Sequence, residues 1–294
     1  MSRKVPEGKW PPDGLSGYTK CVTAPFTSAP AAATARRASA AAFDLPGGPD
    51  VALLLHGLTG TPFEMRHVAE RLNRNGLRCV GPIMAGHGGE PRALARLDWQ
   101  AWVEGARGEL DGLRGARRVY LVGCSMGALV ACALAHAAPE RVAGLALLAP
   151  ALHLQRAGQL AALLGRLPFA AWLPPVPKVA GSDVRDPEAR RENPTMPGVP
   201  VRAVAELAAL SRHVDRLLPA IAVPALVVAA REDHTVRLSG AERIALRLGG
   251  PARLLVLERS FHLVGIDVER DRCADEVASF FDGRPPGAAT RFQR

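Results

Sequence analysis

The pentapeptide GCSMG, at residues 123–127, places Ser125 between two glycines, each two positions away. Residues 119–122 before it (VYLV) form a short apolar run, which is typical of a strand buried on both faces. Residues 128–135 after it are mostly good helix formers. A strand that turns into a helix with almost no loop strains its corner residue, needs glycines for close approach, and leaves the corner side chain at a helix N-terminus. The pattern therefore predicts a nucleophilic serine, with a plain helix cap as the alternative.

A serine hydroxyl is a poor nucleophile unless a base takes its proton and a third group orients that base. The sequence offers eight histidines for the role of base. His262, in the segment ERSFHLVGID, follows the last predicted strand and precedes the last predicted helix, which places it at the carboxyl edge of the strands. His56 and His87 are expected on loops at the same edge, but they precede the serine in the chain. We therefore expect His262 to be the base.

The acid that orients the base is expected at the end of the preceding strand, where the segment VPALVVAAREDHTV offers Glu232 and Asp233. A carboxylate there would accept a hydrogen bond from the imidazole, fix its tautomer and stabilise the imidazolium. We favour Asp233, and we keep Glu232 and the more distant Asp215 as alternatives. The chain order is then Ser125, Asp233, His262, which is the order of the α/β-hydrolase fold.

Acyl transfer places negative charge on an oxygen in its transition state, and preorganised amides must stabilise that charge. One such amide is expected to be that of Met126, directly after the nucleophile. The loop HGLTG, at residues 56–60, follows an earlier predicted strand, and its glycines allow the backbone to approach a substrate. The amide of Leu58 is therefore the expected second donor, and a plain glycine-rich turn is the alternative.

These residues need a scaffold that brings them to one edge. Apolar runs predict strands at residues 51–57, 77–83, 119–122, 142–150, 223–230 and 252–258. Helical patterns lie between or after them, at residues 61–76, 98–113, 128–135, 238–249 and 269–281. Continuous apolar strands that alternate with helices predict an α/β fold, with a mostly parallel sheet and helices on both faces. A short edge strand is also expected between residues 31 and 50.

The stretch of residues 151–218 interrupts this alternation and is too long for a normal crossover. We expect it to form a small cap over the carboxyl ends of the strands, where open α/β sheets bind ligands. The core is then expected at residues 46–150 and 219–284, with a poorly ordered extension at residues 1–45 and a tail at residues 285–294. Apolar side chains of the cap are expected to line an acyl channel: Leu152, Leu154, Leu160, Leu163, Leu164, Leu167, Phe169 and Trp172.

Composition restricts the class of protein. The chain has 294 residues, of which 48% are hydrophobic, and this is enough for a large core. It has no apolar run of about 18 residues that would span a membrane, and its start lacks the apolar region of a secretory signal. The five cysteines are odd in number and scattered, which fits neither a disulfide framework nor a zinc site. We therefore expect no metal and a cytoplasmic location.

The net charge of +9 raises the question of nucleic-acid binding. The arginines are, however, interleaved with acids, as in EARRE and DVERDRCADE, rather than gathered on one face with aromatic residues. This pattern disfavours a nucleic-acid partner and leaves room for loose contact with a membrane surface. The sequence does not indicate the oligomeric state.

Five segments in order across residues 51–280 carry a resemblance to a known family: LLLHGLTGTP, GPIMAGHG, GCSMGALV, LLPAIAVPALVVAAREDHTV and FHLVGIDVERD. The chain resembles the α/β-hydrolase superfamily, and more narrowly the bacterial monoacylglycerol lipases and related small carboxylesterases. The resemblance implies that Ser125, Asp233 and His262 form a catalytic triad and that the amides of Leu58 and Met126 form the oxyanion hole. It also implies a small cap, a narrow apolar acyl channel and no cofactor.

The chain also departs from that family. Leu58 stands where the relatives usually have phenylalanine, so its amide is available but the pocket wall differs, and Cys124 in the elbow is a small change. In those lipases a cap glutamate near a GSD motif helps to hold glycerol. The segment GSDVRDPEARREN offers Glu188 or Glu192 for this role without a certain register.

The predicted function is a serine hydrolase that cleaves carboxylic esters, above all monoacylglycerols or other medium-chain acyl esters, through an acyl-enzyme. An acyltransferase, a lactonase or a C–C hydrolase that uses the same triad is the alternative, because the fold does not determine the substrate. A catalytically silent binding protein is disfavoured by the complete set of residues. The serine at the corner disfavours haloalkane dehalogenases and epoxide hydrolases, which need a carboxylate there.

Overall fold

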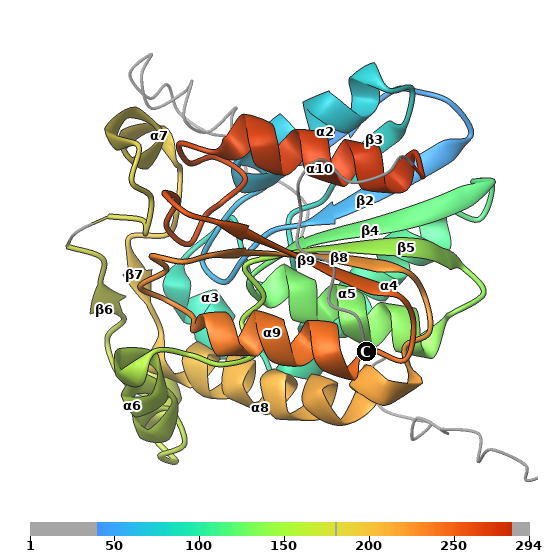
Figure 1. The fold of residues 1–294 in the computed structure, drawn as a ribbon. Coiled ribbons are helices and arrows are strands. Elements are labelled where there is room, and N and C mark those ends of the chain that lie inside the picture. The colour runs from blue at the N-terminus through green and yellow to red at the C-terminus, as the bar shows by residue number, and fades with distance from the viewer. Residues whose placement is uncertain (1–39, 180, 284–294) are drawn as a thin grey trace, which may run out of the picture.

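The computed structural model describes residues 40–179 and 181–283, and its centre is a seven-stranded sheet (Figure 1). The order of the strands is β1-β3-β2-β4-β5-β8-β9. Their bounds are Phe43–Leu45 for β1, Asp50–Leu55 for β2, Arg78–Gly81 for β3, Arg118–Cys124 for β4, Val142–Leu148 for β5, Ala225–Ala230 for β8 and Ala252–Leu257 for β9. β1 is antiparallel to β3, and the other pairings in this sheet are parallel. The predicted α/β class with a mostly parallel sheet is confirmed.

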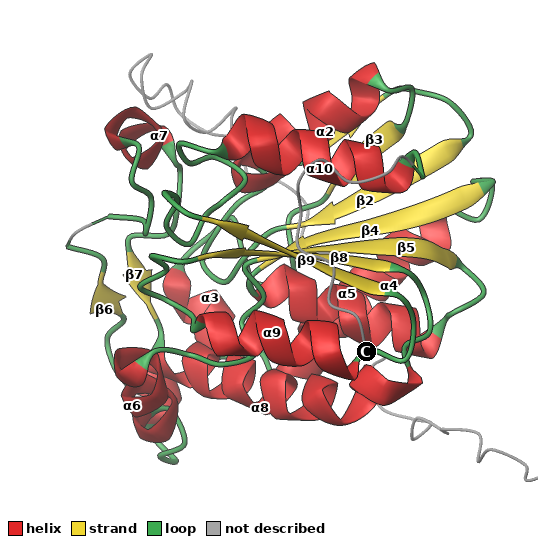
Figure 2. Ribbon diagram, viewed as in Figure 1, coloured by secondary structure: helices red, strands yellow, loops and turns green. Residues whose placement is uncertain are grey.

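Helices cover both faces of the sheet, as Figure 2 shows. One face carries α2 (Phe63–Arg74) and α10 (Arg270–Phe281). The other carries α4 (Trp99–Gly112), α5 (Met126–Ala137), α8 (Val201–Leu217) and α9 (Leu238–Arg247). Because both faces are covered, β2 and β8 are buried at every position, which explains why their sequences are continuous apolar runs.

The β3 region differs in detail from the prediction. The strand ends at Gly81, directly before Pro82, rather than at residue 83. The short helix α3 (Pro91–Ala95) was not expected, although Pro91 at its first position is a favourable start. β1 is the short edge strand that was expected.

The insertion between β5 and β8 has two parts. The first contains α6 (Arg156–Leu164), the 3-10 turn η1 (Ala170–Trp172), β6 (Val176–Pro177), α7 (Pro187–Glu192) and β7 (Gly198–Val199), and β6 pairs with β7. These elements lie beside the carboxyl ends of the parallel strands (Figure 1). The second part, α8, packs along α5 and α4 in the helical layer. We propose that the cap comprises residues 151–200 and that α8 belongs to the core.

Parts of the predicted organisation fall outside the described residues. These parts are residues 1–39 of the expected N-terminal extension, which include Cys21, and the expected tail at residues 285–294. Within the described chain, the other four cysteines are free and buried, and no helix has the length and apolar character needed to cross a membrane.

The joint between β4 and α5 depends on two close backbone contacts. A Cβ atom on Gly127 would lie 2.1 Å from the carbonyl oxygen of Leu55, at the end of β2. A Cβ atom on Gly123 would lie 2.3 Å from the carbonyl oxygen of Gly127. Real Cβ atoms do not approach backbone this closely. The glycines predicted from the sequence are therefore required for α5 to start against the neighbouring strand.

We expect Gly127→Ala to lower the free energy of unfolding by about 1–3 kcal/mol, because the methyl group must push backbone rather than a flexible side chain. Gly108→Ala is the matched control. Gly108 lies in α4, and its Cβ would meet nothing within 4 Å, so this change should stabilise the protein by about 0.5–1 kcal/mol. Urea unfolding followed by circular dichroism measures both values. Equal stabilities of the two variants would contradict the close-contact account.

Candidate active site

Ser125 occupies the corner between β4 and α5 in a strained backbone conformation. Its φ is 54° and its ψ is −108°, and a non-glycine residue with positive φ is held only where the surroundings determine it. The adjacent chain supplies that support. The Ser125 amide donates to the carbonyl of Leu148 at 2.8 Å, and the Ser125 carbonyl accepts from the amide of Ala151 at 3.2 Å. The end of β5 thus holds the corner in place.

The structure brings together Ser125, which follows β4, Asp233, which follows β8, and His262, which follows β9. Nε2 of His262 lies 2.9 Å from Oγ of Ser125, and Nδ1 lies 2.8 Å from Oδ2 of Asp233. All three side chains are buried. With the carboxylate ionised, Nδ1–H donates to Asp233, and Nε2 remains free to accept the serine proton.

The Asp233 carboxylate is itself held by backbone amides. Its Oδ1 accepts from the amide of Thr235 at 2.8 Å and from the amide of Val236 at 2.7 Å. Its two oxygens are therefore divided between the loop and the imidazole. This arrangement fixes the orientation of the acid toward His262.

The two alternative acids have other partners. Glu232 is half exposed and pairs with Arg185. Asp215 lies on α8, where it accepts hydrogen bonds from Arg243 at 2.6 and 2.8 Å. Of these three carboxylates, Asp233 is the one that contacts His262.

The charges around His262 decide its protonation. Burial by itself lowers the pKa of His262, but the charge and hydrogen bond of Asp233 raise it. The charges of Asp183 and Glu64 act in the same direction, and the net result is a pKa above the ordinary histidine value. The imidazole is therefore a stronger base than a free histidine.

The loop that follows β2 is fixed from inside the core. Gly57 donates its amide to Oε2 of Glu64 at 3.2 Å, and its carbonyl accepts from Nδ1 of His56 at 2.9 Å. Nε2 of His56 accepts from the amide of Met84 at 3.0 Å, which determines this tautomer. Burial and the neighbouring His87 lower the pKa of His56 to about 3, so His56 is neutral and acts as a hydrogen-bonding clamp.

The cap fixes the same loop from outside. Thr59 has a φ of 62°, and its carbonyl accepts from the amide of Met196 and from the hydroxyl of Thr195, both at 2.9 Å. Nζ of Lys178 in turn donates to Oγ1 of Thr195 at 2.6 Å. The cap and the core therefore meet at this loop.

Two amides are available beside Ser125. Met126 is the first residue of α5, so its amide has no acceptor one turn back in the helix. Among the described residues, the amide of Leu58 has no hydrogen-bond acceptor. The loop of Leu58 approaches the serine closely, because a Cβ atom on Gly57 would lie 3.4 Å from Cβ of Ser125. These amides have the character that an oxyanion hole requires.

Sequence reasoning missed Glu64, a fully buried carboxyl in the first turn of α2. Burial raises its pKa, and the charge of Lys178 and the hydrogen bonds from Gly57 and Asn193 oppose that effect. A glutamate in the first turn of a helix is ordinary, so the sequence alone carried no signal of its contact with the loop.

The glutamates predicted for glycerol binding lie elsewhere. Glu188 and Glu192 are both exposed on α7, and Glu188 faces Arg191 at 3.7 Å. Neither contacts the side chains of Ser125, His262 or Asp233 within the described structure.

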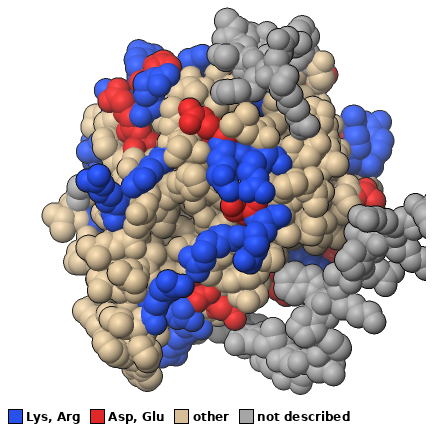
Figure 3. Space-filling model, turned by 60° about the horizontal axis from the view of Figure 1, so that its bottom comes forward, with Lys and Arg blue, Asp and Glu red and all other residues tan. Residues whose placement is uncertain are grey.

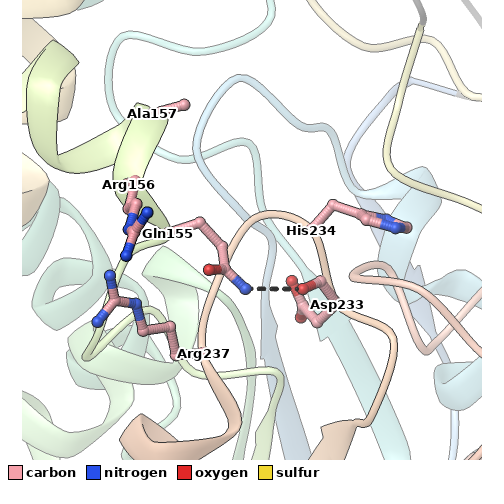
Figure 4. Close-up of a pocket in the computed structure, with 6 residues that line it drawn as sticks. All are labelled: Gln155, Arg156, Ala157, Asp233, His234 and Arg237. Atoms are coloured by element: carbon pink, nitrogen blue, oxygen red, sulfur yellow. Dashed lines mark hydrogen bonds between the residues drawn. The ribbon is translucent and has the colours of Figure 1, made fainter.

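A hollow of about 590 Å³ lies beside the Asp233 loop (Figure 4). Its wall includes Gln155, whose Nε2 donates to the carbonyl of Asp233 at 3.0 Å, and the side chains of Arg156 and Arg237. The acid loop is thus tied to the start of α6 in the cap. Over the described residues, no group of three or more histidine, cysteine, aspartate or glutamate side chains could hold a metal ion.

Most of the apolar residues predicted to line an acyl channel face outward. Leu152 and Leu154 are buried. The other six are between 41% and 83% exposed, which places them on the outside of the cap rather than in an enclosed channel: Leu160, Leu163, Leu164, Leu167, Phe169 and Trp172.

Comparison with known proteins finds relatives that are named as lipases and esterases. The chain is 27% identical over 243 residues to a thermostable monoacylglycerol lipase of Bacillus sp. (strain H-257), covering 81% of this chain and 93% of the relative. It is 26% identical over 243 residues to a carboxylesterase of Bacillus subtilis (strain 168), and the match covers 82% of this chain and 95% of the relative. A solved structure reported for two metagenome-derived lipolytic enzymes, LipS and LipT, matches this chain with a TM-score of 0.76 and 27% identity. The match covers 84% of this chain and 98% of that chain.

A family model also matches most of the chain. Residues 50–269 match the model described as "Serine aminopeptidase, S33". This range contains Ser125, His262 and Asp233, whose side chains are in contact, together with the loop at residues 56–60 and the loop that carries Asp233. The chain belongs to this family of hydrolases and has the α/β-hydrolase fold.

Proposed function

We propose that this protein is a serine hydrolase that cleaves carboxylic esters through an acyl-enzyme on Ser125. The observation that carries the proposal is the unbroken contact from Asp233 through His262 to Ser125, beside two amides that have no acceptor among the described residues. The relatives named monoacylglycerol lipase and carboxylesterase support the same reaction class. Monoacylglycerols or other medium-chain acyl esters are the proposed substrates.

The geometry supports a two-step mechanism. His262 takes the proton of Ser125 through Nε2 as Oγ attacks the ester carbonyl carbon, and Asp233 stabilises the imidazolium that forms. The amides of Leu58 and Met126 donate to the oxygen that becomes negative. His262 then gives its proton to the departing alcohol, which leaves the acyl group on Ser125. A water molecule, deprotonated by His262, releases the acid and restores the serine.

Other reactions use the same groups. Acyl transfer to another acceptor, lactone opening and C–C bond hydrolysis all need a serine, a base and an oxyanion hole. No described contact favours one of them over ester hydrolysis. Product analysis separates them, because hydrolysis releases the free acid and the alcohol in equal amounts.

The substrate class is tested with a series of p-nitrophenyl esters from acetate to palmitate, beside monoacylglycerols and triacylglycerols. Each methylene that enters an apolar site contributes about 0.8 kcal/mol. The outward-facing cap residues do not enclose the acyl chain. We therefore expect kcat/KM to rise with chain length to an optimum at roughly C8 to C12 on that increment and to fall once the chain extends beyond the apolar site, with weak activity on triacylglycerols. A flat profile or a preference for acetate would contradict the proposed substrates.

Ser125→Ala should fold normally and lose essentially all esterase activity, because no other hydroxyl contacts His262 in the described structure. An organophosphonate should label the wild-type protein at Ser125 alone, as peptide mass spectrometry would show. Labelling at another serine, or substantial turnover by the variant, would reject Ser125 as the nucleophile.

Asp233→Asn should reduce kcat on the order of 10³-fold or more, because the amide no longer holds the productive tautomer of His262. Glu232→Gln is the matched control and should cost little. Catalysis needs a neutral imidazole, so activity falls as the pH drops through the pKa of His262. Asp233 raises that pKa, so the acid limb of the kcat/KM profile should move to lower pH in Asp233→Asn. A larger loss of kcat in Glu232→Gln than in Asp233→Asn would instead assign the role of the acid to Glu232.

A further inference from the structure

The outer side of the cap presents an apolar surface that no described part of the chain covers. This cap apolar surface consists of six large side chains: Leu160, Leu163, Leu164, Leu167, Phe169 and Trp172. Trp172 is 83% exposed, and Leu163 is 60% exposed. A contiguous exposed patch of this kind marks a contact site, because monomeric soluble proteins rarely leave one without a function.

Arginines border the cap apolar surface. A hollow of about 530 Å³ between α6 and α8 is lined by Leu163 together with Arg166, Arg212 and Arg237. Arg237 also lines the hollow beside the Asp233 loop, together with Arg156 (Figure 4). These four arginines therefore form a continuous cationic border. Figure 3 shows basic side chains, with acidic ones among them, beside a large uncharged surface on one face of the molecule.

The four border arginines differ from their neighbours in pairing. Arg243 and Arg247 both face Asp215, and Arg202 pairs with Glu206 on α8. In the described parts of the chain, no carboxylate lies within ion-pair distance of the border arginines. Their charge is thus free to act on something outside the molecule.

We propose that the cap apolar surface and the four border arginines dock this protein on an anionic lipid surface. Leucine, phenylalanine and tryptophan side chains enter the boundary between headgroups and acyl chains, while cationic side chains lie against the phosphates. A second copy of the chain fits this surface less well. A twofold contact would bring two sets of unpaired arginines together, and like charges in one interface repel.

Docking goes beyond the proposed ester hydrolysis and does not require it. It would concentrate the protein where acyl esters of low solubility collect. Two of the border arginines, Arg156 and Arg237, also line the hollow beside the Asp233 loop, so the proposed docking surface adjoins the loop that carries the acid. A soluble short-chain ester needs no such surface, and this allows the two proposals to be tested separately.

The test uses the full chain and unilamellar vesicles of phosphatidylglycerol or of phosphatidylcholine, with binding measured by co-sedimentation. We expect binding to phosphatidylglycerol that weakens as salt is raised, and little binding to phosphatidylcholine. The apolar variant Leu163→Ser/Trp172→Ser and the charge variant Arg166→Gln/Arg212→Gln should each weaken binding by about tenfold or more, as expected for two lost contacts near a charged bilayer.

Arg74→Gln/Arg114→Gln is the matched control. It removes the same charge from the end of α2 and from the turn after α4, and it should leave vesicle binding nearly unchanged. All three double variants should hydrolyse p-nitrophenyl acetate at the wild-type rate. Failure of that hydrolysis in the wild type would count against the proposed function and not against docking.

Three results would overturn the docking proposal. The first is that the control variant weakens vesicle binding as much as the charge variant does, because net charge alone would then explain the binding. The second is vesicle binding that survives the apolar variant, or no binding by the wild type. The third is a concentration-dependent dimer that disappears in the apolar variant, because a second copy would then cover this surface.

Discussion

The close approach of α5 to the end of β2 is the constraint on which the rest of the site depends. Gly127 allows the helix to start against the carbonyl of Leu55, so β4 turns into α5 without a loop. This turn holds Ser125 at positive φ, with its side chain at the carboxyl edge of the sheet. The same turn leaves the amide of Met126 free at the helix start. One steric requirement thus positions both the proposed nucleophile and one of the two amides proposed for the oxyanion hole.

The remaining groups reach the serine because parallel strands end at one edge. Asp233 follows β8 and His262 follows β9, and these strands are neighbours in the sheet. The Asp233 carboxylate divides its two oxygens between loop amides and the imidazole, so both oxygens are held in place before any substrate binds. Preorganised charge of this kind needs no rearrangement during the reaction, which is why it stabilises a transition state effectively.

The loop at residues 56–60 joins the core to the cap. His56 and Glu64 hold it from the core, and Thr195 and Met196 hold it from the cap. The position of the cap therefore bears directly on the oxyanion hole. The cap also carries exposed apolar residues, which lie beside four arginines that have no carboxylate partner among the described residues, and we propose that this surface meets lipid. The cap thus holds the loop at residues 56–60 in place, and its exposed apolar residues are proposed to contact lipid.

The sequence by itself determined the α/β class and predicted the corner serine and the base, because these depend on local patterns: apolar strands that alternate with helices, glycines around a strand-to-helix turn, and a histidine directly after the last strand. It favoured Asp233 but left Glu232 and Asp215 as alternatives, because the path of a loop decides which carboxylate meets the imidazole. It gave no sign that Glu64 supports the oxyanion loop, or that most of the predicted acyl-channel residues face outward. Those outcomes were decided by tertiary structure, because they depend on contacts between segments far apart in the chain.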